Sequence, residues 1–141
     1  MSWGLAICLE ALRWRSTMWK LVFSTALLVV STSVLSIAGE ADVVAVDIRQ
    51  SGPETFSFEV TVRHDDQGWQ HYADRWDVVG PDGTVLGSRK LLHPHDTEQP
   101  FTRGLSGVRI PRSVPQVSVR AHDTQHALGG KALTIEVPHG D

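Results

Sequence analysis

Beyond an apolar N-terminal segment, the chain alternates between apolar and polar residues over short stretches. The clearest stretch is 55–63, in which Phe56, Phe58, Val60 and Val62 would face one side and the residues between them the other. Alternation with a period of two is typical of a β-strand with one buried face. The pattern therefore predicts a half-buried strand here.

The same reading predicts seven strands, at 43–49, 55–63, 72–79, 84–92, 100–108, 116–121 and 132–137. The sequence Gly80-Pro81-Asp82-Gly83 is typical of a tight hairpin turn, because proline presets φ and glycine accepts a positive φ. No helical period of useful length is present. We expect an all-β fold, a seven-stranded antiparallel sandwich of the immunoglobulin or fibronectin III type, with Trp76 buried on its third strand.

The N-terminal segment has the layout of a secretory signal peptide. Lys20 precedes the apolar stretch 21–30, and Ser36 and Ala38 place small residues before a cleavage point at Gly39. We therefore expect a signal peptide with an extended n-region over 1–38 and a β-sandwich domain over 39–141, located in the periplasm or secreted.

Two alternatives stay open for this segment. An uncleaved membrane anchor is one, because 21–38 approaches the roughly 20 residues that span a bilayer, although six serines and threonines weaken it. The other concerns the start of translation, since Met18 begins a complete signal by itself.

Cleavage would leave a domain with 10 basic and 15 acidic residues, and hence a net charge of −5 with neutral histidines. Such a surface disfavours nucleic acid as a partner, and no membrane contact is expected after cleavage. The one cysteine, Cys8, lies in the predicted leader. Any metal in the domain must therefore bind nitrogen and oxygen ligands.

The block 68–103, GWQHYADRWDVVGPDGTVLGSRKLLHPHDTEQPFTR, resembles a stretch found in small exported bacterial proteins of unassigned function. The resemblance covers part of the predicted domain and implies export. It implies no activity, cofactor or site residue.

Histidines carry the candidate chemistry. If strands and loops alternate, the loops near 64–71, 93–98 and 122–130 share one end of the fold and His139 lies at the other. Six of the seven histidines would then gather into a possible transition-metal site: His64, His71, His93, His95, His122 and His126.

Strand parity narrows this set. Pro94 favours an extended geometry for His93, which would point the rings of His93 and His95 the same way. The expected ligands are this pair with His126 and one of His64, His71 or His122. His64 could instead be a core-capping histidine. His122 has outward parity, and so does His71 unless a bulge intervenes. Carboxylates nearby could orient the rings or bind directly: Asp65, Asp66, Asp96, Glu98 and Asp123.

The domain composition fits Zn or Cu(II), because it lacks the cysteine and methionine ligands that favour Cu(I). No nucleophile elbow, phosphate loop or dinucleotide fingerprint occurs, so we expect a protein that is not an enzyme. Two other readings stay open: an envelope protein-interaction or ligand-binding module that uses Trp69 and Tyr72 as anchors, and a histidine surface that loosens in acid.

Overall fold

The computed structural model describes residues 39–140. The predicted signal peptide, 1–38, lies outside the described residues, as does residue 141. The described part contains seven strands and no helix, so none of its residues forms a helix that could cross a membrane. The strands are β1 (Asp42–Gly52), β2 (Thr55–Arg63), β3 (Ala73–Val79), β4 (Val85–Lys90), β5 (Phe101–Arg109), β6 (Gln116–Asp123) and β7 (Leu133–Glu136).

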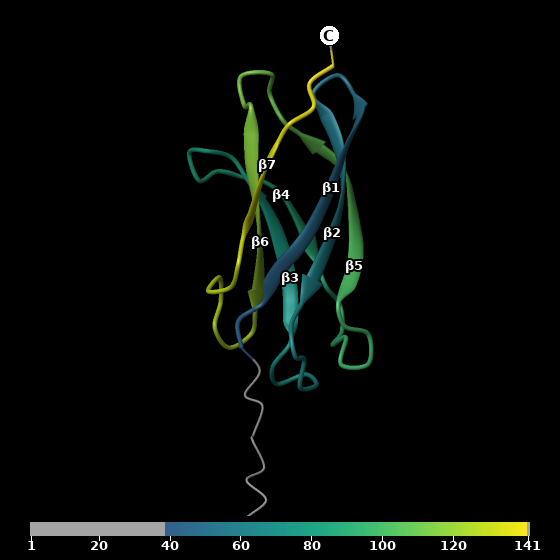
Figure 1. Cartoon of the computed structure of the whole chain (residues 1–141), viewed down its shortest axis with the longest axis vertical. Coiled ribbons are helices and arrows are strands. Elements are labelled where there is room, and N and C mark those ends of the chain that lie inside the picture. The colour runs from purple at the N-terminus through teal and green to yellow at the C-terminus, as the bar shows by residue number, and fades with distance from the viewer. Residues whose placement is uncertain (1–38, 141) are drawn as a thin grey trace, which may run out of the picture. The chain divides into compact units, whose positions relative to one another are not determined.

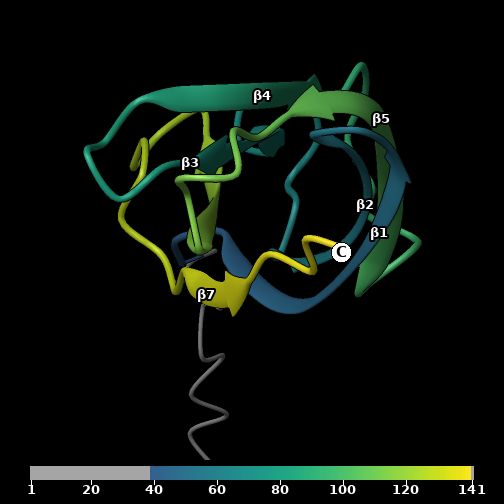
Figure 2. The same cartoon turned by 90° about the horizontal axis from the view of Figure 1, so that it is seen from above.

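The strands form two antiparallel sheets that face each other (Figures 1 and 2). One sheet has the order β1-β2-β5 and the other the order β4-β3-β6-β7. The prediction of an all-β fold with seven antiparallel strands is confirmed, and the predicted bounds of the second strand coincide with those of β2.

The alternation in the sequence builds the core between the two sheets. Phe56, Phe58, Val60 and Val62 of β2 are at most 1% exposed, and the expected tryptophan, Trp76 of β3, is fully buried. Removing a side chain of this size from water contributes about 1.5–3 kcal/mol to stability. The apolar rows of the central strands therefore supply most of the force that holds the sheets together.

A β-bulge in β3 changes which residues face inward. Ala73 pairs with Asp123 and Arg75 pairs with His122, so Asp74 is an extra residue in the ladder. A bulge of this kind reverses the side-chain alternation on the two sides of it. As a result, Ala73 and Trp76 are both buried in the core although their parities differ.

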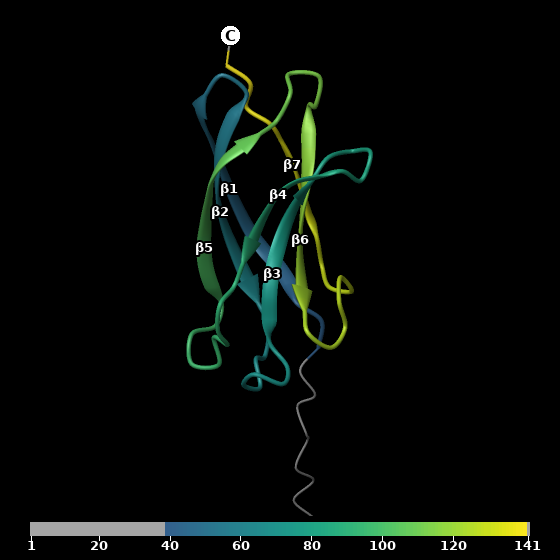
Figure 3. The same cartoon turned by 180° about the vertical axis from the view of Figure 1, so that it is seen from behind.

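The three histidine-bearing loops lie at one end of the sheets, as the strand alternation predicts (Figure 3). These are the β2–β3, β4–β5 and β6–β7 loops. The β3–β4 hairpin lies toward the other end, where His139 packs edge-on against Phe56.

Gly83 provides a test of the β3–β4 hairpin. Its φ is +84°, and its backbone N–H donates to the Gly80 carbonyl at 3.0 Å. Gly83→Ala should lower the free energy of unfolding by about 1–2 kcal/mol, because a Cβ disfavours positive φ, while a Cβ there would meet nothing within 4 Å. Urea unfolding measures the loss. Gly83→Asn should lose less, and equal losses in both variants would contradict the conformational explanation.

Candidate metal centre

His64 and Asp66 continue the core-facing row of β2 beyond the end of the strand. The side chains of both are 0% exposed, whereas Asp65 between them is exposed. His64 Nδ1 lies 2.5 Å from Asp66 Oδ1. Because a carboxylate accepts this hydrogen bond, Nδ1 carries the hydrogen and Nε2 is the nitrogen available to a ligand. His64 Nε2 is buried and forms no close hydrogen bond among residues 39–140, although a weaker interaction with the Gly39 backbone contributes to the raised pKa of this histidine.

Asp123 approaches His64 from the opposite sheet. It ends the core-facing row of β6 and is 0% exposed. Its Oδ1 accepts the backbone N–H groups of Gln125 and His126 at 2.9 and 2.7 Å, which fixes the carboxylate. Its Oδ2 is buried without a hydrogen-bond partner in the described part of the chain.

His71 completes the group because the β3 bulge turns it inward. Its Nε2 lies 3.1 Å from Asp123 Oδ1, and its ring lies edge-on to that of His64 at 4.7 Å between centroids. The sequence predicts an outward orientation of His71 unless a bulge intervenes, and the structure contains that bulge. Each of His64, His71 and Asp123 has one ligand atom within 4.8 Å of those of the other two.

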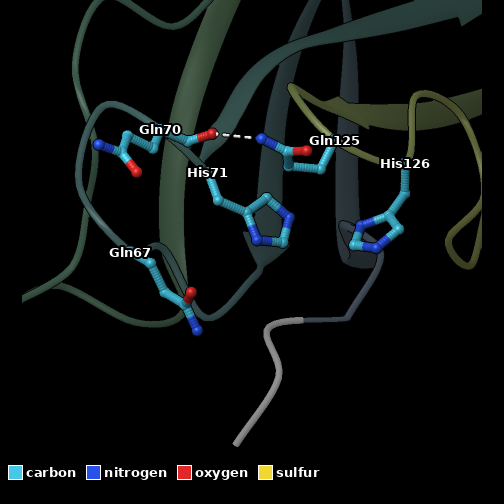
Figure 4. Close-up of a pocket in the computed structure, with 5 residues that line it drawn as sticks. All are labelled: Gln67, Gln70, His71, Gln125 and His126. Carbon is cyan, nitrogen blue, oxygen red and sulfur yellow. Dashed lines mark hydrogen bonds between the residues drawn. The ribbon is translucent and has the colours of Figure 1, made fainter.

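His126 lies beside this group at its solvent side. Its Nδ1 is 3.2 Å from Asp123 Oδ1, and its ring centroid is 4.9 Å from that of His71. Figure 4 shows both rings at a pocket of about 340 Å³, where Gln125 donates to the Gln70 carbonyl at 2.7 Å. The buried group is therefore reachable from solvent past His71 and His126.

The pKa shifts of His64, Asp66 and Asp123 each favour the charged form of the group. Burial alone would lower the pKa of His64, but the hydrogen bond that His64 donates to Asp66 and the charges of Asp66 and Asp123 raise it overall. Burial would raise the pKa values of Asp66 and Asp123, yet hydrogen bonds lower both. His64 and backbone N–H groups donate to Asp66, and backbone N–H groups donate to Asp123. Both carboxylates are therefore ionised at neutral pH.

The pair His93 and His95 lies next to this group but is not part of it. The two rings are 4.7 Å apart, and His95 stacks on Phe101 with a centroid distance of 3.9 Å. His95 reaches the group only through Asp66, which accepts its backbone N–H at 2.6 Å and lies 4.0 Å from its Nδ1. The structure thus brings His64, His71 and His126 together and leaves His93 and His95 as a second pair.

The remaining histidines lie elsewhere. His122 is on the outer face of its sheet, as its parity predicts, with Nδ1 2.6 Å from Asp74 Oδ1. His139 is at the opposite end, with Nε2 2.9 Å from the Val114 carbonyl.

Sequence reasoning left open whether Asp123 orients a ligand ring or binds the metal directly, and the structure places it within the group of possible ligands. The signal for a direct role was present, because Asp123 shares the inward parity of Val117, Val119 and Ala121 on β6. A carboxylate on a core-facing row needs a partner. The inward position of His71 had no such signal, because a bulge has no clear mark in this sequence.

The pKa of His95 leads to a prediction for acid stability. Burial and the charges of Arg103 and His93 lower this pKa, and outweigh the opposing charges of Asp66 and Glu98. Neutral His95 therefore contributes to the stability of the folded state at pH values above 6.5, its pKa in the unfolded chain. This contribution is lost as the pH falls below that value and His95 becomes protonated. In the presence of a chelator, His95→Gln should lose less stability than the natural protein between pH 7.5 and 5.5. Urea unfolding at both pH values measures this, and equal losses would contradict it.

Comparison with known proteins finds a likeness that covers 72% of the chain. No family model matches the chain, and no solved structure matches it. The chain is 42% identical over 101 residues to a protein of Halomicrobium mukohataei named "Putative lipoprotein". The matched part is 72% of this chain and 49% of the relative, so the chain spans about half the length of the relative that it matches.

Proposed function

We propose that the protein is an exported, non-enzymatic domain that binds one divalent transition-metal ion, Zn or Cu(II). The proposed ligands are His64 through Nε2, His71 and Asp123, with His126 as the fourth. The observation that carries the proposal is the grouping of one ligand atom from each of His64, His71 and Asp123 within 4.8 Å of one another, with His64 Nε2 and Asp123 Oδ2 buried and without a close hydrogen bond among residues 39–140.

Unpaired buried polar atoms support a ligand at this position. His64 Nε2 and Asp123 Oδ2 are both buried and form no close hydrogen bond within the described part of the chain. Leaving one such atom without a partner costs about 1–3 kcal/mol. Both atoms belong to residues of the proposed ligand group, and a bound ion could satisfy them.

The distances fit a four-coordinate ion. Ligand atoms held at Zn–N and Zn–O distances of about 2.0–2.2 Å in a tetrahedron are about 3.3 Å apart. Asp123 Oδ1 lies 3.1 Å from His71 Nε2 and 3.2 Å from His126 Nδ1. The ligand atoms of His64, His71 and Asp123 are at most 4.8 Å apart, and His126 lies just outside this group, so binding would draw the four side chains closer together.

Charge supports a divalent ion. Asp66 and Asp123 are buried and ionised, and buried charges are stable only when they are paired. Asp66 is paired with His64, so Asp123 is the carboxylate whose charge a bound cation would offset directly. Asp66 would not bind the metal; it would hold the His64 ring in the tautomer that exposes Nε2, an arrangement common around zinc-bound histidines.

Two further parts of the proposal concern location and fold type. The name of the Halomicrobium relative supports export, together with the predicted signal peptide. The strand order supports a fibronectin III-like sandwich, because β4 pairs with β3 and leaves β1, β2 and β5 as a three-stranded sheet. In the immunoglobulin constant type the larger sheet instead contains the first strand.

Metal titration of the full chain, purified without a histidine tag, tests the proposal. We expect one equivalent of Zn(II) per chain, with tighter binding of Cu(II) as is general for such ligands. His71→Ala should weaken Zn(II) binding at least about tenfold, because it removes one of four ligands. Isothermal titration calorimetry measures the stoichiometry and affinity.

Matched histidine variants serve as controls. His122→Ala and the double variant His93→Ala/His95→Ala should keep one equivalent of Zn(II). Loss of binding in the double variant with retention in His71→Ala would overturn the ligand assignment. Micromolar or weaker binding that survives all of these changes would favour an interaction module without a metal.

The orienting role of Asp66 has its own test. Asp66→Asn should reduce Zn(II) affinity about 10- to 100-fold, the usual effect of losing a carboxylate that orients a ligand histidine. The exposed neighbour variant Asp65→Asn should have no effect. Unfolding curves in chelator show whether each variant is folded, and an unchanged affinity in folded Asp66→Asn would contradict the role.

A further inference from the structure

A second pocket lies where the edges of the two sheets meet. β4 is an edge strand of one sheet and β5 an edge strand of the other, and the two run next to each other (Figure 2). The pocket has a volume of about 70 Å³ and is separate from the proposed metal centre. Its lining comes from the end of β4, the β4–β5 loop and β5: Arg89, Lys90, Leu91, Leu92, His93, His95 and Arg103.

The polar part of this lining is basic. The side chains of Arg89 and Lys90 are exposed and form no hydrogen bond or ion pair within residues 39–140. Arg103 is bonded to Glu98, with its Nη2 2.9 Å from Glu98 Oε2, so Glu98 offsets one positive charge. Asp66 lies behind His95 and is already paired with His64. Two cations in the pocket therefore have no counter-charge.

His95 supplies a buried polar group at the pocket. It is 4% exposed, and neither of its ring nitrogens has a hydrogen-bond partner in the described part of the chain. The ring is fixed by stacking on Phe101, with an interplanar angle of 12°. A rigid imidazole with no partner costs stability unless a ligand meets it.

The sign of the local field favours an anion over a metal ion. Burial lowers the pKa of His95 most, and the charges of Arg103 and His93 lower it further, against the opposing charges of Asp66 and Glu98. Arginine, lysine and imidazole N–H groups are donors that bind phosphate oxygens, and arginine matches their geometry. The volume is well below the roughly 300–1,000 Å³ of pockets for larger organic ligands. A single phosphate group fits both the charge and the size.

We propose that the pocket between β4 and β5 binds a phosphate group, held by Arg89, Lys90 and the ring of His95. Arg103 closes the far side, fixed by Glu98. The exposed mouth of the pocket lets the phosphate belong either to a free ion or to the headgroup of a lipid. This site is independent of the proposed metal centre.

Nuclear magnetic resonance titration with inorganic phosphate, in a buffer with EDTA, tests the proposal without any metal. The His95 ring signals should shift and saturate. Lys90→Gln should weaken phosphate binding about tenfold or more, because a charge-assisted hydrogen bond is lost. The conservative variant Lys90→Arg should bind phosphate as tightly as the natural protein. Arg49→Gln, which removes an exposed arginine bonded to Asp47 on β1, should leave the affinity unchanged.

The second arm uses vesicles of phosphatidylglycerol in phosphatidylcholine, compared with vesicles of phosphatidylcholine alone. Binding that needs phosphatidylglycerol and is lost in Lys90→Gln identifies a lipid phosphate as the source. The proposal is overturned if neither phosphate nor vesicles shift the His95 signals, or if Arg49→Gln weakens binding as much as Lys90→Gln. Saturable binding of Zn(II) by His93 and His95 in phosphate-free, chelator-free buffer would also overturn it.

Discussion

The buried carboxylate of Asp66 holds the histidine-bearing end of the domain together. It accepts hydrogen bonds from His64 Nδ1, from the backbone N–H of Ala73 at 3.0 Å and from the backbone N–H of His95 at 2.6 Å. These donors belong to the end of β2, the start of β3 and the β4–β5 loop. A buried charge needs several partners to be stable. The requirement is met only when the three segments lie together, so this one group fixes the positions of two loops.

The inward-facing side chains of β2 and β6 are apolar along each strand and become polar at its end. The inward row of β2 runs from Phe56 to Val62 and then continues with His64, and the inward row of β6 ends in Asp123. Because the two rows face each other across the sheets, their polar ends meet. The proposed metal centre is therefore a continuation of the packing, and rigid strands set the spacing of its ligand atoms.

The sequence predicted the strands and the common end of the three loops, because both depend on alternation and on counting reversals of the chain. It did not predict which histidines meet. The bulge at Asp74 reverses the orientation of His71. No residue in this part of the sequence is characteristic of a bulge. The local spacing of His93 and His95 favoured them as ligands, but their surroundings depend on Arg89, Lys90 and Arg103, which only the meeting of β4 and β5 brings close.

The shortness and charge of β4 have a consequence for behaviour at high concentration. A bare strand edge is a template onto which another copy can add, and natural proteins discourage this with short strands and outward lysine or arginine side chains. β4 has six residues and ends in Arg89 and Lys90, whereas β7 on the other side of the same sheet has only four residues. Both borders of the larger sheet thus resist edge-to-edge growth, which would keep the folded domain from forming fibrous aggregates.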